Sequence, residues 1–478
     1  MVKQEKLVEE ITSRDVDFSK WYTDIVKKAK LMDYSSVKGC MIIRPYGFAI
    51  WENIQKFLDK TFKYLGHENV AMPLLIPESL LQKEKDHIKG FAPEVAWITE
   101  CGSEKLPERL CIRPTSETLF CSHYSQIIES YRDLPKLYNQ WCSVVRWEKT
   151  SRPFLRSVEI FWQEGHTVHE TAQEAVEETK KMLDVYVNFF KNQLLIPVIS
   201  GEKSEKEKFS GAKNTYTVEA LMYDGKALQS ATSHYFSDNF SKAFNITFRD
   251  RKNKISYPFG TSWGLATRVI GAVIMVHGDD NGLVLPPDIS PIQVIIIPIT
   301  LKNDFVIKKT YEIFGILSLN FRVKLDDSKR SPGWKFSEYE MKGVPIRLEL
   351  GPKDIEKNQC VLVRRDNQKK VFVSIENLKK SVLNTLNDIK KNMYETANNR
   401  LRSRTYEATD LQNFLDLSKN KQGFIKAMWC GDVACENKLK ELALVSLRCI
   451  PFNQERISEN CVCCKKKAES MVYFGKSY

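Results

Sequence analysis

One stretch of the chain combines charged and aromatic side chains at high density. Residues 144–166 read VVRWEKTSRPFLRSVEIFWQEGH and contain arginines, glutamates, tryptophans and a histidine. A core strand has no use for so many charges, and a solvated loop has no use for the aromatic rings. Arginine holds a carboxylate or a phosphate through two parallel hydrogen bonds, which lysine cannot reproduce. The stretch therefore predicts a site that binds an anion and encloses a planar or apolar group.

The spacing within this stretch suggests how its side chains are grouped. Arg146 and Glu148 are two residues apart, so on a strand they would share one face. Arg156 follows after a loop, and Trp162 and His166 lie four residues apart. A surface hairpin with ion pairs and packed tryptophans is the alternative interpretation.

A second stretch, LCIRPTSETLF at 110–120, places a hydroxyl close to a carboxylate. Thr115 and Glu117 would share one face of a strand, where together they suit a bound ammonium group. The same Ser/Thr–Glu pattern is also an ordinary helix-start signature. Both interpretations stay open on the sequence alone.

Two later stretches add further polar candidates. QSATSHYF offers Gln229, Thr232 and His234, for which a polar edge strand is the alternative. In SWGLATR, Gly264 could let a ligand approach the backbone closely, and Arg268 lies at the start of an apolar helix. A buried arginine needs an anionic partner, because an unpaired buried charge costs several kcal/mol. A substrate phosphate and a structural carboxylate would both serve.

Hydrophobic periodicity indicates which elements position these residues. It predicts amphipathic helices at 14–31 and 47–65, a buried strand at 69–77, a long helix at 171–194 and an apolar helix at 264–278. Strand-like segments fill 195–263, so the first region mixes strands and helices in an α+β core. The proline-rich segment LVLPPDISPIQ then marks a boundary, and helices alternate with strands as in a smaller α/β domain. We expect three domains, at 1–285, 286–402 and 403–478.

Several of the twelve cysteines gather in the last domain. Cys430 and Cys435 form a C-x4-C pair, and Cys461, Cys463 and Cys464 follow. Four thiolates in a cytoplasmic protein fit a tetrahedral, structural Zn²⁺ site, which would stabilise so short a domain. Spacing alone favours the C-x2-C pair of Cys461 with Cys464. Reduced thiols without a metal are the alternative.

Composition limits the class of protein. The chain has 478 residues, of which 42% are hydrophobic, so an ordered globular protein is expected. No run approaches the ~20 apolar residues of a membrane span, and the charged start lacks the apolar middle of a signal peptide. We therefore expect a cytoplasmic protein. The net charge of +12 suits a polyanionic partner, although a general lysine bias would give the same charge.

Together the motifs resemble a known family. RPTSET, VVRWE…FLR…WQEGH, KSEKEKFSGA, ATSHY and SWGLATR…HGDDNGLVLPP occur in the order found in class II prolyl-tRNA synthetases of the archaeal/eukaryote-like type. The resemblance implies an antiparallel catalytic sheet and ATP-dependent ligation of L-proline to tRNA(Pro) through a prolyl-adenylate. It also implies Mg²⁺ with ATP, a homodimer with Pro73 at its interface, and some activation of cysteine. Only 167–261 separates the second and third class signatures, so no editing insertion is expected.

The resemblance also assigns roles to the candidate residues. Arg146 would bridge the amino-acid carboxylate and the α-phosphate, and Arg268 would lie near adenine and the γ-phosphate, so both would be catalytic. The residues for proline would be Thr115, Glu117, Arg146, Trp162, His166, Phe209 and His234. The residues for ATP would be Arg146, Glu148, Arg156, Ser157, Gln229, Thr232, Gly264 and Arg268. The chain departs from the family at Ile160, where an aromatic residue that stacks on adenine is expected.

For the other two domains the resemblance implies tRNA binding and a metal. The segment 343–367 mixes cations with carboxylates, which suits base edges better than phosphates, and a solvated charged turn is the alternative. As anticodon-binding residues we expect Arg347, Glu349, Lys353, Asp354 and Arg364. The family tail usually reads C-V-C, so the zinc ligands would be Cys430, Cys435, Cys461 and Cys463. The terminal Tyr478 would point its carboxylate toward the active site.

A competing hypothesis is an inactive synthetase paralogue that binds RNA or regulates another process. Loss of the motif arginines would favour it, but Arg146, Arg156 and Arg268 are all present. A ligase that uses a non-tRNA acceptor would be expected to lack the second domain.

Overall fold

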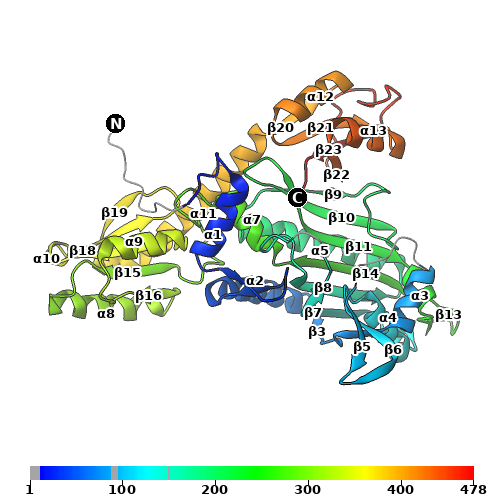
Figure 1. The fold of residues 1–478 in the computed structure, drawn as a ribbon, viewed down its shortest axis with the longest axis horizontal. Helices are drawn as coiled ribbons and strands as arrows, with labels where there is room; N and C mark the ends of the chain where they lie inside the picture. The colour runs from blue at the N-terminus through cyan, green and yellow to red at the C-terminus, as the bar shows by residue number, and fades with distance from the viewer. Residues whose placement is uncertain (1–10, 88–94, 149–150) are drawn as a thin grey trace.

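A long mixed sheet runs through the molecule and carries the catalytic strands. The computed structural model describes residues 11–87, 95–148 and 151–478, and Figure 1 shows this sheet with a smaller lobe beside it. Its eleven strands follow the order β20-β21-β23-β22-β9-β10-β11-β14-β8-β7-β3. The seven strands from the first domain are β9 (Val198–Glu202), β10 (Asn214–Leu221), β11 (Ala227–Ser237), β14 (Phe259–Ala266), β8 (Glu159–His169), β7 (Lys136–Val145) and β3 (Glu68–Asn69). All but β3 pair antiparallel with their neighbours, as expected for an α+β core.

Helices cover this sheet where the periodicity predicted them. They are α1 (Phe18–Lys28), α2 (Pro45–Tyr64), α5 (Ala172–Asn192) and α7 (Arg268–His277). A capping box between Thr171 and Glu174 starts α5, and its apolar stripe, with Met182 and Tyr186, is buried in the main core. The apolar helix begins only at Arg268, because the preceding residues belong to β14.

The predicted buried strand at 69–77 is wrong. The segment divides into β3, a connecting stretch and β4 (Leu75–Pro77), and Pro73 and Leu74 are exposed. Proline cannot donate to a strand ladder, and the Met72 backbone N–H donates to the Gln140 side chain at 3.1 Å. β4 instead joins a small sheet with β6 (Glu104–Ile112) and β5 (Trp97–Cys101).

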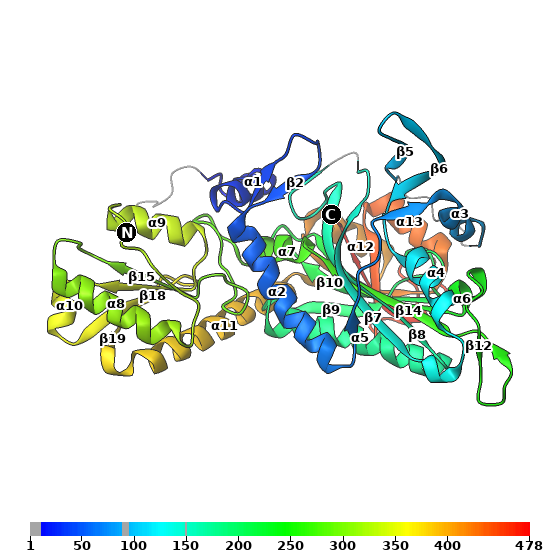
Figure 2. The same cartoon turned by 90° about the horizontal axis from the view of Figure 1, so that it is seen from below.

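Short elements fill the remainder of the first domain. They are the strands β1 (Met32–Tyr34), β2 (Met41–Ile43), β12 (Phe248–Arg249) and β13 (Ile255–Ser256), and the helices α3 (Glu78–His87), α4 (Glu117–Ile127) and α6 (Asn239–Ala243). Figure 2 shows α3, α4 and the β5–β6 hairpin at the end of the molecule far from the second domain.

The second domain is an α/β unit with its own core, as predicted. Its five-stranded sheet has the order β16-β15-β17-β18-β19, with parallel β15–β16 and β15–β17 pairs. The strands are β15 (Val294–Pro298), β16 (Val323–Leu325), β17 (Ile346–Leu350), β18 (Gln359–Arg364) and β19 (Lys370–Ser374). The helices are α8 (Asp304–Ser318), α9 (Pro332–Met341), α10 (Pro352–Glu356) and α11 (Leu378–Ser403). α11 leads from this domain to the last one (Figure 1).

The third domain extends the catalytic sheet. It contributes β20 (Thr405–Ala408), β21 (Phe424–Trp429), β22 (Ser446–Pro451) and β23 (Ser470–Gly475), with α12 (Leu411–Asn420) and α13 (Val433–Ala443). β22 pairs antiparallel with β9 through Ile450↔Glu202 and Pro451↔Gly201. Across the described segments, no helix is long and apolar enough to cross a membrane.

Candidate active site

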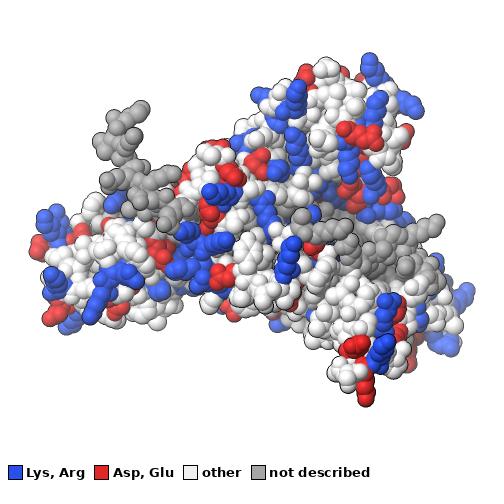
Figure 3. Space-filling view, viewed as in Figure 1, with Lys and Arg blue, Asp and Glu red and all other residues white. Residues whose placement is uncertain are grey.

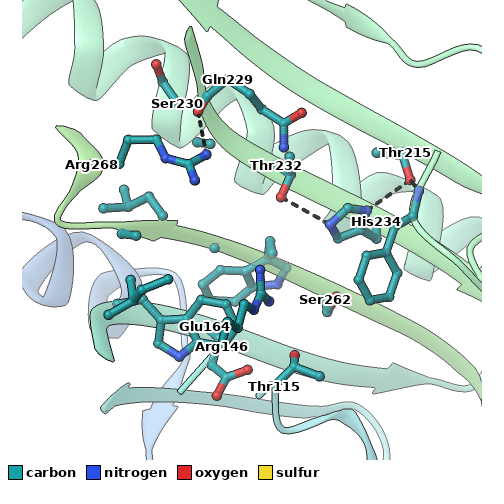
Figure 4. A pocket seen from close by; sticks show the side chains of 18 of the residues that line it. Thr115, Arg146, Glu164, Thr215, Gln229, Ser230, Thr232, His234, Ser262 and Arg268 are labelled. Carbon is teal, nitrogen blue, oxygen red and sulfur yellow. Dashed lines mark hydrogen bonds between the residues drawn. The ribbon is translucent and has the colours of Figure 1, made fainter. Parts of the chain in front are cut away.

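A cavity of about 250 Å³ lies on the face of the catalytic sheet and gathers most of the predicted site residues. Its walls come mainly from β8, β10, β11 and β14, with additions from the segments around Thr115 and Arg146 (Figure 4). The predicted residues that line it are Thr115, Glu117, Arg146, Ser157, Trp162, Phe209, Gln229, Thr232, His234, Gly264 and Arg268. Three predicted residues, Glu148, Arg156 and His166, are not part of its lining.

Two arginines point into this cavity from different walls. Arg146 donates its Nε to the Pro114 carbonyl at 3.0 Å, and Arg268 donates to the carbonyls of Leu155 and Gln229 at 3.2 and 3.3 Å. Among the described residues, neither forms an ion pair with a carboxylate. Burial lowers the pKa of both guanidinium groups, and Arg146 and Arg156 add repulsion at Arg268. Two half-buried cations whose side chains donate hydrogen bonds only to carbonyls suit an anionic ligand.

Acidic side chains line the part of the cavity near Arg146 and away from Arg268 (Figure 4). Glu117 is buried and accepts a hydrogen bond from the Thr115 hydroxyl. The predicted shared strand face is wrong, because Glu117 is the first residue of α4 and Thr115 precedes that helix. A helix does start here, with Ser116 at its N-cap but no side-chain capping hydrogen bond, and both Thr115 and Glu117 still lie on the cavity wall. A carboxylate and a hydroxyl at this position suit an ammonium group.

Sequence reasoning missed a second acidic group, Glu164. Its carboxylate lines the cavity and accepts hydrogen bonds from Ser116 Oγ at 2.5 Å and Gln140 Nε2 at 2.6 Å. His166 lies behind it, with Nε2 2.9 Å from Glu164 Oε2 and its ring stacked on Phe120. Burial would lower the pKa of His166, but Glu164 raises it above its ordinary value. Residues 162, 164 and 166 are two apart on β8 and therefore share one face of the strand, and this spacing could have identified Glu164 from the sequence.

His166 therefore does not line the cavity, contrary to the expectation that it walls the proline ring. Trp162 does line it, and Arg146 lies over the indole ring at 5.2 Å. Phe209 packs on His234 with ring centroids 4.8 Å apart. His234 uses both ring nitrogens, toward Thr215 at 3.0 Å and Thr232 at 3.1 Å, and burial lowers its pKa to about 3. It is thus a neutral, fixed part of the wall.

A register shift explains why Gln229 and Thr232 both line the cavity although they are three residues apart. Thr232 pairs with Thr217 on β10, but Gln229 pairs with Glu219, so β11 carries one extra residue, Ser230. The extra residue places two side chains that are three residues apart on the same face of the strand. On β14, a Cβ at Gly264 would lie 2.7 Å from the Gln163 carbonyl, so only glycine fits there.

The remaining predicted ATP residues lie around this cationic end. Arg146 and Glu148 do not share a strand face, because β7 ends at Val145. Glu148 and Arg156 form a partly exposed ion pair of 3.8 Å, and buried Ser157 lines the cavity. Ile160 lines the cavity too, whereas Phe161 packs edge-on against Phe48 outside it. The aliphatic residue therefore occupies the position where a planar group would need a stacking partner.

The cysteine cluster has one member that differs from the predicted set. The sulfurs of Cys430, Cys435, Cys461 and Cys464 all lie within 4.8 Å of one another, with Cys464 3.6 Å from Cys430. Cys464 thus replaces Cys463, because a tight turn brings residues three apart to one side, but not residues two apart. Tetrahedral Zn²⁺ with ~2.3 Å bonds would hold thiolates ~3.8 Å apart, and four sulfurs at this spacing fit such an ion.

In the second domain the predicted residues are mostly paired. Arg347 contacts Glu349 at 2.9 Å, and Arg364 binds Asp366 through two hydrogen bonds of 2.9 and 2.6 Å. Asp354 accepts from the Gly351 N–H, and Lys353 lies on α10 beside it. In the third domain, the Tyr478 hydroxyl donates to Asp224 at 2.7 Å, and Arg152 lies over its ring.

Comparisons with known proteins agree with this arrangement. Three family descriptions match: "tRNA synthetase class II core domain (G, H, P, S and T)" over residues 99–277, "Anticodon binding domain" over 293–385, and "Prolyl-tRNA synthetase, C-terminal" over 411–478. The chain is 62% identical to "Proline--tRNA ligase" of Ruminiclostridium cellulolyticum and 63% identical to that of Clostridium novyi, each over 478 residues and the full length of both chains. It is 60% identical over 471 residues to "Proline--tRNA ligase 2" of Bacillus cereus, covering 98% of this chain and 99% of the relative.

Proposed function

The chain belongs to the class II prolyl-tRNA synthetase family, and from this premise we propose that it ligates L-proline to tRNA(Pro) through a prolyl-adenylate. The observation that supports this proposal is a single cavity lined both by two arginines without an ion-pair partner among the described residues and by the buried carboxylates Glu117 and Glu164. A zwitterionic amino acid and a polyphosphate together have the complementary charges.

In the first step, proline binds with its ring ammonium toward Glu117 and Thr115. Its carboxylate oxygen attacks the α-phosphorus of ATP, the bond to the β-phosphate breaks, and pyrophosphate leaves. Arg146 neutralises the carboxylate and the α-phosphate, and Arg268 neutralises the outer phosphates, so the protein acts by positioning and charge stabilisation. Mg²⁺ enters with ATP as part of the substrate.

In the second step, a hydroxyl of the terminal ribose of tRNA attacks the prolyl carbonyl and AMP leaves. Trp162 and Phe209 enclose the apolar ring of proline, and Glu164, oriented by His166, completes the wall. Cysteine is close to proline in size, so we also propose a low level of cysteine activation.

The other domains complete the proposal. Residues 286–402 would bind the anticodon through Arg347, Glu349, Lys353, Asp354 and Arg364, and 403–478 would hold a structural Zn²⁺. Figure 3 shows lysine and arginine side chains spread over the visible face of the molecule, which suits a large polyanion. We propose a cytoplasmic homodimer, in which a partner covers the exposed Pro73 and Leu74 beside the end strand β3. The chain from β8 to β14 is short, which supports the archaeal/eukaryote-like type without an editing insertion.

ATP–pyrophosphate exchange with each standard amino acid tests the proposal. We expect proline-dependent exchange, weaker cysteine-dependent exchange, and loss of both in Arg146→Ala. Arg364→Ala is the matched control, since this arginine is paired and lies outside the cavity, and it should exchange normally. Absence of exchange from folded, zinc-loaded protein would refute the enzyme and favour an inactive RNA-binding paralogue.

A further inference from the structure

A buried cluster of three charges joins the third domain to the wall of the catalytic cavity. Lys203 on the segment after β9, Glu219 on β10 and Arg448 on β22 are all buried, with Glu219 fully inaccessible. Lys203 Nζ donates to Glu219 Oε1 at 2.8 Å and to the Arg448 carbonyl at 2.7 Å. Arg448 donates Nε and Nη2 to Glu219 Oε2 at 3.1 and 2.8 Å. One carboxylate thus holds two cations from two domains.

Two irregularities of the long sheet meet at this carboxylate. On β11 the extra residue Ser230 lies directly beside Gln229, the partner of Glu219. On β22 the register shifts between Leu447 and Cys449, so Arg448 is the extra residue there. Bulges redirect side chains and bend strands, and they are treated as designed features of a fold. The charge cluster connects the two bulged strands through Glu219 and can hold both bulges in register.

The bulge on β11 belongs to the cavity wall. Gln229, Ser230 and Thr232 line the cavity, and the Gln229 carbonyl accepts a hydrogen bond from Arg268 (Figure 4). A shift of this bulge would therefore move both the Gln229 side chain and an anchor of Arg268. The expected partners of proline's ammonium group, Thr115 and Glu117, lie on other segments and form no described hydrogen bond with the cluster. His234 of the ring wall lies on β11 beyond the bulge, and its two ring nitrogens face Thr215 and Thr232 rather than the cluster.

Stability alone does not explain the cluster, since three apolar side chains of similar volume are often as stable as a buried ion network. Burial alone would raise the pKa of Glu219, but Lys203 and Arg448 hold it below its ordinary value, so the carboxylate is charged and the cluster carries one net positive charge. A net cation behind the Gln229 wall also favours a polyphosphate on the other side.

We propose that Arg448, Glu219 and Lys203 are positioning residues for ATP, through which the third domain fixes the Gln229–Thr232 bulge and the orientation of Arg268. This inference rests on the proposed function only in naming ATP as the ligand. Removing Arg448 or Lys203 should weaken ATP binding and leave proline binding unchanged.

Calorimetric titration of the full-length, zinc-loaded protein with a non-hydrolysable ATP analogue, and separately with proline, tests the inference. Arg448→Met and Lys203→Met should each weaken binding of the analogue about tenfold, with unchanged affinity for proline. Arg456→Met is the matched control, because it breaks an exposed arginine–glutamate pair of the same domain and should change neither affinity. Lys203→Met leaves the Arg448–Glu219 hydrogen bonds between the two domains in place, so it remains informative if Arg448→Met fails to fold.

Several outcomes would overturn the inference. Unchanged affinity for the analogue in Lys203→Met would do so, as would equal weakening of analogue and proline, which indicates general loss of structure. If the unmodified protein binds the analogue but not proline, the proposed function fails while the role of the cluster is still decided by the analogue titrations.

Discussion

The two arginines of the cavity and Arg365 of the second domain are held in opposite ways. Arg146 and Arg268 donate only to backbone carbonyls, and burial lowers their pKa. Arg365 is buried more deeply than these two half-buried side chains, but it binds Asp279 through two hydrogen bonds of 2.7 and 2.6 Å, which raise its pKa despite burial. Asp279 neutralises Arg365 within the protein, whereas Arg146 and Arg268 line a cavity that a ligand could enter.

Substitution of Arg268 tests the first half of this comparison with the largest expected effect. Arg268→Met should lower the rate of pyrophosphate exchange by about 10²–10³-fold, as expected for loss of one preorganised charge. Because the unpaired charge destabilises the empty protein, the melting temperature should stay equal or rise. Exchange kinetics and thermal denaturation without ligands measure both effects. A clear fall in melting temperature would show that Arg268 is a structural cation after all.

The cysteine cluster extends the comparison to anions, because four neighbouring thiolates need a metal cation to neutralise their charge. Cys464→Ser should weaken zinc binding by at least about 100-fold, above the usual effect of an outer-shell change. Cys463→Ser is the matched control and should retain one zinc per chain, since its sulfur lies outside the group of four. Metal analysis after dialysis against a graded chelator measures this. The reverse result would restore Cys463, the ligand expected from the family tail.

Substitution of Arg365 tests the second half of the comparison. Arg365→Met leaves Asp279 without its cation and should lower the free energy of unfolding by about 2–3 kcal/mol. Affinity for the ATP analogue should not change, because Arg365 is outside the cavity. Denaturant titration and calorimetry measure the two quantities. Equal stability together with weaker analogue binding would remove the distinction between paired and unpaired arginines.

Local chemistry made much of the site predictable. The types of Arg146, Arg268, Thr115 and Glu117 predicted residues that do line one cavity, and periodicity predicted the helix at 171–194 that is observed as α5. Failures arose where the outcome depends on distant pairing. The bulge at Ser230, which turns Gln229 toward the cavity, requires the register of β10, and the β22–β9 pair joins strands far apart in sequence. His166 behind Glu164 likewise depends on which strand face meets Phe120.

Substitution of Ile160 in the apolar wall of the cavity has the smallest expected effect on ATP affinity. It changes the shape of the wall without changing a charge. Ile160 lines the cavity, and its aliphatic side chain takes no part in the hydrogen bonds of the charged residues. Ile160→Phe therefore changes only the surface offered to a planar base. A stacked aromatic pair adds about 0.5–1.5 kcal/mol beyond area burial, which corresponds to ATP binding tighter by about two- to tenfold. Phe161→Leu is the control, because Phe161 packs on Phe48 outside the cavity and should affect stability alone. Calorimetry with the ATP analogue measures the gain. No gain, or weaker binding, would mean that adenine does not lie against residue 160, and the cationic end would then hold the phosphates of a nucleotide whose base is bound elsewhere.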